Sequence, residues 1–144
     1  MEMDEEFLET YNLDWFASCP DGQLAHFATG GRCFVPMAVR RSLSIYENIY
    51  DYFLSVEDDI AFEIVEGNLP EFSDSVQRER YLRSFVDMAR KGLFSYDVSN
   101  SGGYSLIAKP QRNRRIDDLP LGVRRSVHVL RLRFSVRMDE SDLF

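Results

Sequence analysis

The alternation of apolar and polar residues near the N-terminus predicts a β-hairpin. Between residues 11 and 18 an apolar side chain occupies every second position, the period of two that is typical of a strand: Tyr11, Leu13, Trp15 and Ala17. Pro20-Asp21-Gly22 follows, where proline suits the first turn position and glycine takes the positive φ that closes the turn. Residues 24–29 then return as the second strand, and two glycines end it.

A helical pattern begins after this hairpin. Pro36 suits the first turn of a helix, where its missing N–H has no partner to lose. From there apolar side chains recur at steps of four and three, which indicates one buried helical face: Val39, Leu43, Tyr46, Tyr50 and Phe53. The stripe is too short for a coiled coil, so it predicts a helix packed on a core. We expect Trp15 to be buried against this helix.

The clearest helix is predicted between Ser75 and Lys91. Its apolar side chains gather on one face: Tyr81, Leu82, Phe85, Met88 and Ala89. Arg90 and Lys91 suit the C-terminal end of the helix dipole, and Gly92 is a typical C-terminal cap.

The segment between these helices, residues 55–67, has an ambiguous pattern. Ser55 to Asp58 resembles a capping box that would begin a helix, and Gly67 could end it. However, Ile60, Phe62 and Ile64 alternate as in a strand. Of the two, we favour a helix.

The remaining sequence predicts a second hairpin, a short helix and a final strand. The hairpin has a Ser/Asn/Gly turn at residues 99–103, across which two sets of apolar side chains face each other: Phe94, Tyr96 and Val98 opposite Tyr104, Leu106 and Ala108. Asp117 to Pro120 has the composition of a cap and first turn, for a helix through about His128. Last, Leu132, Phe134 and Val136 alternate with Arg131, Arg133, Ser135 and Arg137, which predicts a strand with one basic face.

This order of elements indicates an α+β protein. Two hairpins with helices grouped between them favour an antiparallel sheet rather than a doubly wound parallel one. Isolated hairpins are marginally stable, so we expect both to join one sheet with the C-terminal strand, with the helices mainly on one face. The chain of 144 residues has no repeat or linker, so residues 1–144 are expected to form one domain.

The composition and the first residues of the chain predict where in the cell the protein is found. With 44% hydrophobic residues the chain can form a core, yet no apolar run approaches the roughly 20 residues of a membrane span. Four of the first six residues are acidic, unlike a secretory signal. We therefore expect a cytoplasmic protein with no membrane partner, in which Cys19 and Cys33 stay reduced and unpaired.

The sequence contains no recognisable motif for cofactor binding or catalysis. Glycine pairs occur outside any phosphate-binding pattern, and a metal site from Cys19, His26 and Cys33 would lack an evident fourth ligand. His26 lies within a predicted strand and His128 in an arginine-rich stretch, where a structural role is the default. Adjacent carboxylates such as Asp58 and Asp59 point in different directions in regular structure. We expect no enzyme, no cofactor and no metal; a cleft holding a carboxylate of raised pKa near His26 would favour an enzyme instead.

The charges divide unevenly along the chain, whose net charge is −7. Residues 1–75 carry 16 acids and 3 bases, whereas residues 76–144 carry 8 acids and 14 bases. Two interpretations stay open: the halves pair with each other on folding, or they leave a segregated surface that steers a charged partner.

The basic half contains a loop cluster and one face of the predicted last strand: Lys109, Arg112, Arg114 and Arg115, then Arg131, Arg133 and Arg137. Such a stripe could neutralise phosphates, with Tyr104 stacking on a base. The acidic overall charge argues against a nucleic-acid partner, because the acidic half would repel a polyanion. Pairing of these arginines with the protein's own carboxylates is the simpler interpretation.

The acidic half contains a segment in which carboxylates and apolar side chains alternate closely. We take its members as candidate partner-binding residues: Glu57, Asp58, Asp59, Ile60, Phe62, Glu63, Glu66, Glu71, Phe72 and Asp74. Apolar anchors supply affinity and a charged rim steers association, so this mixture is typical of inhibitors that block a basic protein.

Two stretches carry a resemblance to a known group. They are Asp14-Trp15-Phe16-Ala17 with Asp21-Gly22 and His26-Phe27-Ala28-Thr29-Gly30-Gly31, and then Met88-Ala89-Arg90-Lys91-Gly92-Leu93-Phe94-Ser95-Tyr96-Asp97 with Asp118-Leu119-Pro120. Together they resemble small bacterial proteins similar to the immunity proteins that neutralise polymorphic toxins. The resemblance implies a binding role and carries over no catalytic residue.

The sequence therefore predicts a non-enzymatic protein-binding domain, an immunity-type inhibitor of a bacterial toxin that acts through the acidic segment. Its partner would be a basic protein, such as a toxin domain, and the chain itself a monomer or weak dimer. A small hydrolase-like enzyme and a nucleic-acid-binding module remain as alternatives.

Overall fold

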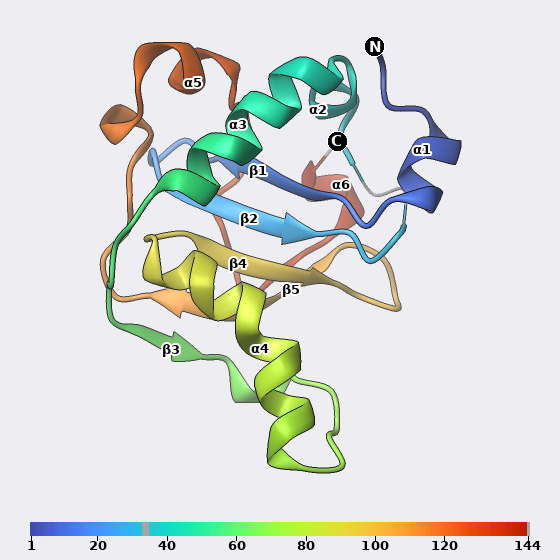
Figure 1. Cartoon of the computed structure of the whole chain (residues 1–144), viewed down its shortest axis with the longest axis vertical. Coiled ribbons are helices and arrows are strands. Elements are labelled where there is room, and N and C mark those ends of the chain that lie inside the picture. The colour runs from blue at the N-terminus through green and yellow to red at the C-terminus, as the bar shows by residue number, and fades with distance from the viewer. Residues whose placement is uncertain (33–34, 144) are drawn as a thin grey trace.

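The protein is an α+β structure built on one mixed sheet, seen in a computed structural model that describes residues 1–32 and 35–143 (Figure 1). Within these residues the sheet has seven strands in the order β3-β5-β4-β2-β1-β6, and β7 also pairs with β5. The elements in chain order are α1 (Glu5–Thr10), β1 (Asp14–Ser18), β2 (Leu24–Ala28), α2 (Met37–Arg40), α3 (Leu43–Ser55), β3 (Phe62–Ile64), the 3₁₀ helix η1 (Glu66–Asn68), α4 (Ser75–Arg90), β4 (Phe94–Val98), β5 (Tyr104–Pro110), the 3₁₀ helix η2 (Ile116–Asp118), α5 (Leu121–Ser126), β6 (His128–Val129), β7 (Arg137–Met138) and α6 (Glu140–Leu143).

Both predicted hairpins are confirmed. β1 and β2 pair antiparallel around the turn at residues 19–23, in which Gly22 has a φ of 80°. β4 and β5 pair antiparallel with Tyr96 opposite Leu106 and a bulge next to Ser95.

The prediction of an antiparallel sheet is wrong, because the two hairpins join through a parallel contact. β2 pairs parallel with β4, and β1 pairs parallel with β6 at the opposite edge. Parallel neighbours need a long crossover connection, usually helical. Here α2, α3, β3 and α4 all lie between β2 and β4 in the chain, so the grouped helices are that crossover.

The two longest helices cover one face of the sheet. α3 packs over β1, and α4 packs over β4 and β5 (Figure 1). α4 confirms the predicted helix and its buried face, and Asp74 caps its first turn. The helix predicted from Pro36 is instead two helices, since Ser42 breaks it and accepts the N–H of Ile45 as the N-cap of α3.

Residues 55–67 do not form the favoured helix. Phe62–Ile64 is β3, which pairs antiparallel with residues 108–110 of β5, and η1 follows. The alternation of Ile60, Phe62 and Ile64 was the better guide, because it let this segment pair with the free edge of β5. Ser55 ends α3, where its hydroxyl donates to the Tyr52 carbonyl, and so caps no new helix.

The predicted C-terminal strand is also wrong for most of its length. Only Arg137–Met138 pairs with β5, while Leu132 and Val136 are exposed. The segment crosses the sheet face opposite α3 and α4 (Figure 1), where the half-buried Phe134 ring lies 5.5 Å from that of Phe94. The Tyr96 hydroxyl donates to the Ser135 carbonyl, so this segment is held by a side-chain hydrogen bond where a strand would have backbone hydrogen bonds.

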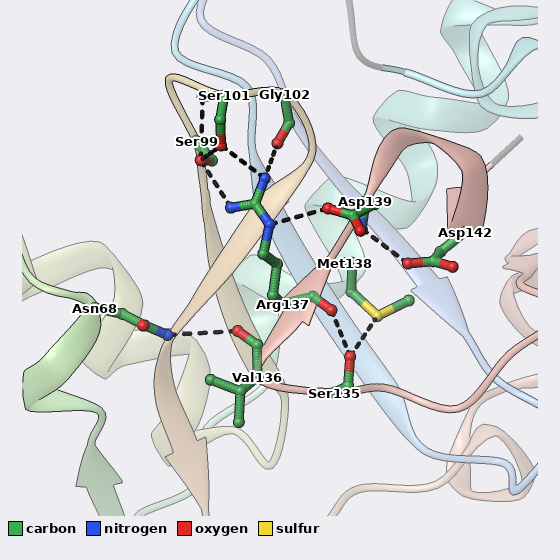
Figure 2. A network of polar contacts seen from close by, with 10 residues as sticks. All are labelled: Asn68, Ser99, Ser101, Gly102, Ser135, Val136, Arg137, Met138, Asp139 and Asp142. Carbon is green, nitrogen blue, oxygen red and sulfur yellow. Dashed lines mark hydrogen bonds and ion pairs between the residues drawn. The ribbon is translucent and has the colours of Figure 1, made fainter.

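Arg137 fastens this segment to the turn of the second hairpin (Figure 2). Its guanidinium donates to the hydroxyls of Ser99 and Ser101, to the Gly102 carbonyl and to the Asp139 carboxylate, over 2.6–2.9 Å. Five N–H donors in a rigid fork make arginine well suited to such a convergent site.

Trp15 is fully buried, as predicted, but in the core on this second face, to which the helix predicted from Pro36 contributes only residues at the margin. The Trp15 ring stacks on Phe27 with centroids 4.2 Å apart, and its Nε1–H donates to the Tyr104 hydroxyl at 3.0 Å. Val39 and Leu43 lie at the margin of the same cluster. None of the helices in the described part of the chain combines the length and apolar composition that a membrane crossing requires.

Candidate functional site

The predicted acidic segment lies along the β3 edge of the sheet. Its carboxylate residues occupy the loops around β3 and η1 and the start of α4, and all are exposed: Glu57, Asp58, Asp59, Glu63, Glu66, Glu71 and Asp74. The structure therefore brings the acidic members to one edge of the molecule.

Arginines from the second half of the chain reach the adjacent pair of aspartates. The Asp58 carboxylate lies 3.1 Å from Arg114 and 3.8 Å from Arg112. Asp59 lies 3.6 Å from Arg90, so the two carboxylates serve different partners. They form neither a catalytic dyad nor a shared metal site.

Two further carboxylates of the segment also have internal partners. Both oxygens of Glu66 accept hydrogen bonds from Arg78, at 2.6 and 2.8 Å, which lowers the pKa of Glu66 below its ordinary value. Asp74 accepts the N–H of Gln77. Among the described residues the other three have no ion pair: Glu57, Glu63 and Glu71. Much of the segment's negative charge is thus compensated within the protein.

The apolar members of this segment differ in accessibility. Ile60 is 7% exposed and packs inside, so it offers little surface to a partner. Phe62 is half-buried with the Arg90 guanidinium 5.6 Å above its ring, and half-buried Phe72 contacts the ring of Tyr81. Only the two phenylalanines keep part of their surface open.

Four of the seven basic residues that the sequence singled out pair with carboxylates of the protein, whereas Lys109, Arg115 and Arg131 have no ion pair among the described residues. Besides Arg112 and Arg114 on Asp58, Arg133 lies 3.0 Å from Asp21 and Arg137 binds Asp139. For these four arginines the simpler interpretation is confirmed, and the contacts with Asp58 and Asp21 join the basic half to the acidic half.

The most polar part of the core surrounds His26, on the sheet face below α3 and α4. His26 is fully buried, with Nδ1 2.8 Å from the Ser95 hydroxyl and Nε2 3.5 Å from Asp14. Nε2 has no hydrogen-bond partner, and the rings of Phe16 and Phe85 lie on either side at 5.7 and 6.2 Å. A serine, a histidine and an aspartate thus meet here, with Ser95 and His26 fully buried and Asp14 partly exposed.

A separate carboxylate near His26 does border a cleft. Asp97 lines a hollow of about 410 Å³ at the second hairpin, and desolvation raises its pKa above the ordinary value. Its two oxygens already accept from the Tyr81 hydroxyl, at 2.7 Å, and from the Val98 N–H, at 2.9 Å. His26 does not line this hollow, so the imidazole and the carboxylate do not act on one cavity.

In the described part of the chain, no group of three or more His, Cys, Asp or Glu side chains is placed to hold a metal ion. Cys19 is a free, buried thiol. Cys33 lies outside the described residues, so the prediction about both thiols stays a prediction.

A hollow larger than the one beside Asp97 lies away from all of these groups, between α2 and the segment that follows β6. It measures about 680 Å³ and is mostly apolar. Two smaller hollows adjoin it, since Ala38 and His128 line the first and second, while Ile45 and Ile49 line the second and third.

We call this row of hollows the α2–α5 groove. One wall comes from α2 and α3, the other from α5, β6 and the residues after them. It exposes large apolar side chains to solvent, by 47–56%: Met37, Ile45, Val129 and Leu132. Contiguous exposed apolar surface of this kind marks interaction sites in soluble proteins.

Arginines line the groove: Arg40, Arg41, Arg125 and Arg131. None of them has an ion pair among the described residues, in contrast to those at the acidic segment. Asp142 is the single carboxylate in the described lining, and it caps the Asp139 N–H. Desolvation lowers the pKa of His128, which favours its uncharged imidazole. The groove is therefore apolar with a positive rim.

Sequence analysis missed this groove because its walls lie about 90 residues apart in the chain. Met37 follows a proline at a helix start, Val129 follows the end of the predicted short helix, and Leu132 belongs to an alternation that predicts a buried strand face. The exposure of Leu132 follows from that strand not forming, which no local pattern indicates.

Comparisons of the chain with protein-family models, with curated proteins and with solved structures give no match.

Proposed function

We propose that this chain is a non-enzymatic protein-binding domain whose main binding surface is the α2–α5 groove. The observation that carries the proposal is the set of large apolar side chains that the groove holds open to solvent: Met37, Ile45, Val129 and Leu132. Their exposure is unfavourable for a chain in water, and a partner that covered them would gain the hydrophobic free energy that folding leaves unused.

Inhibition of a bacterial toxin, which the sequence resemblance implies, is one form that such binding would take. An immunity protein acts by stoichiometric occlusion and needs a surface, not a catalytic centre. The enclosed His26 and Ser95 side chains are in keeping with that role.

The acidic segment is a second candidate surface for the same function. Glu57, Glu63 and Glu71 support it, since they are exposed carboxylates without ion pairs in the described structure. The internal arginine partners of Asp58, Asp59 and Glu66 weaken it, because a basic partner would have to compete with them.

The experiment is capture of the partner from the native host, followed by binding with the purified partner. Tagged wild type is compared with Val129→Glu in the groove and with Val76→Glu on α4, a control of similar exposure (56% and 52%). An Asp58→Lys/Asp59→Lys variant tests the acidic segment. We expect one stoichiometric partner, lost with Val129→Glu and retained by the other two variants.

The inhibitory role has its own readout. Expression of the captured partner alone should arrest growth, and co-expression of the chain should relieve the arrest. If the partner binds Val129→Glu as well as wild type, the groove is not the binding surface. Loss only with the Asp58/Asp59 variant would place the site on the acidic segment.

A further inference from the structure

The shape of the α2–α5 groove restricts what it can hold. Its hollows, of about 680, 280 and 310 Å³, follow one another along two walls and share lining residues. A compact small molecule fills one pocket, whereas a series of adjoining hollows matches the successive anchor side chains of one elongated segment.

The concave form also distinguishes a peptide from a lipid surface. Membrane-binding faces present apolar side chains that project into the bilayer. Here Met37, Val129 and Leu132 line a hollow, and so would surround an inserted side chain.

The charges at the rim indicate the polar part of the occupant. Arg41, Arg125 and Arg131 are exposed, and Arg40 is held at the rim by its Nε–H bond to the Met3 carbonyl. Four cations face one carboxylate in the described lining, and desolvation of the half-buried His128 lowers its pKa, which favours the uncharged imidazole. Carboxylates on the occupant would complement this rim, and basic side chains would be repelled.

We propose that the groove receives an amphipathic helical segment of a partner protein, with apolar side chains on one face and Asp or Glu residues along its margins. This inference rests on the proposed function and specifies the chemistry of the partner. It is opposite in sign to the basic partner that the acidic segment predicts, so the two surfaces select different proteins.

The test uses two labelled peptides of about 16 residues, long enough to form a helix when bound. Both carry leucine at positions i, i+3, i+4, i+7 and i+11; one has glutamate at the flanking positions and the other lysine. Fluorescence anisotropy against the full chain measures their affinities at low and at physiological salt. The glutamate peptide should bind at least about tenfold more tightly than the lysine peptide, and added salt should reduce that ratio.

Matched variants locate the binding. Val129→Glu and Leu132→Glu should each weaken the glutamate peptide at least about tenfold. Arg131→Glu should weaken it about threefold or more at low salt. The controls are Val76→Glu and Arg83→Glu, exposed residues of α4 that should leave the affinity unchanged. Leu132 lies outside the helices and strands, so its variant keeps the test valid if Val129→Glu does not fold.

Several outcomes would overturn the inference. Equal or tighter binding of the lysine peptide would reverse the charge assignment. Binding of phosphatidylserine vesicles, or of dodecyl phosphate, in place of either peptide would assign the groove to a lipid. Dimerisation that Val129→Glu abolishes would assign it to a second copy of this chain. If neither peptide binds but the captured partner still requires Val129, the proposed function stands and the peptide chemistry is wrong. If the captured partner ignores Val129, the proposed function itself fails.

Discussion

The two glycines at the end of the second hairpin provide a matched pair of substitutions. Gly102 and Gly103 both have positive φ, of 94° and 69°. A methyl group on Gly102 would meet no atom within 4 Å. The same group on Gly103 would overlap the Met138 carbonyl oxygen and lie 2.9 Å from the Asp139 Cα. Both of these contacts are backbone, which cannot rotate away as a side chain can.

The expected magnitudes follow from this difference. Gly102→Ala costs only the free energy of placing a side chain on a left-handed backbone, about 1–2 kcal/mol. Gly103→Ala costs the same and must also displace β7 from the hairpin. That movement would expose part of Met138, now 1% exposed, whose burial is worth about 1.5–3 kcal/mol. It would also disturb the hydrogen bonds of Arg137 (Figure 2). We expect a total loss of about 3–5 kcal/mol for Gly103→Ala.

Urea unfolding followed by the fluorescence of Trp15, the single tryptophan, measures both variants on one scale. Thermal unfolding gives a second measurement. A loss of 1 kcal/mol lowers the melting temperature of a domain near this size by about 2–4 °C, so it should fall by only a few degrees for Gly102→Ala and by roughly 10 °C for Gly103→Ala. Equal stability of the two variants would refute the close approach of β7 to the hairpin.

Two further predictions concern the core. Trp15 should emit at a blue-shifted wavelength in the folded protein, and Trp15→Ala should lower the free energy of unfolding by about 3–5 kcal/mol; emission like that of indole in water would contradict its burial. Desolvation raises the folded-state pKa of Asp97, so its contribution to stability is complete below the unfolded value of about 3.9 and is lost as pH rises through the folded pKa. Asp97→Asn, which stays neutral and can still accept from Tyr81, should therefore be more stable relative to wild type at pH 7 than at pH 4, measured as urea midpoints across that range. A constant difference between the two proteins would show that Asp97 is not desolvated.

The parts of the fold that sequence predicts correctly are those fixed by neighbouring residues. The Pro20-Asp21-Gly22 turn leaves the first hairpin few alternatives, and Gly102 and Gly103 do the same for the second. α4 has a capping aspartate, one apolar face and a glycine just after its end, so three local signals agree.

The wrong predictions each depend on a contact between distant residues. Whether the hairpins meet parallel or antiparallel is decided by the path of the crossover between β2 and β4, which no residue within either hairpin encodes. The segment at residues 131–136 has the alternation of a strand, yet β5 already pairs with β3 and β4 over most of its length. On the edge of β5 that β3 shares, β3 pairs with residues 108–110 and β7 with Tyr104 and Ser105, while the rest of the segment crosses the sheet face.

The acidic segment shows why charge in a sequence is a poor guide to charge on a surface. Its carboxylates attract arginines from the other half of the chain, as Arg114 on Asp58 and Arg90 on Asp59 demonstrate. The uneven division of charge along the sequence is therefore partly compensated on folding, because arginines of the second half pair with carboxylates of the first.

The pairing of arginines with carboxylates within the protein decides which arginines can act on a partner. Arginines that bind carboxylates within the protein are held in place and contribute little to long-range steering. Those without such partners are the ones whose field a binding protein would meet, and several of them lie at the α2–α5 groove, where Arg41, Arg125 and Arg131 line the hollows beside apolar side chains. A protein whose net charge is −7 would thus attract an acidic segment locally while repelling acidic proteins at a distance. Selectivity of that kind favours a partner whose carboxylates are confined to one short segment and whose remaining surface is basic, because such a partner is drawn by the overall field and then oriented by the rim.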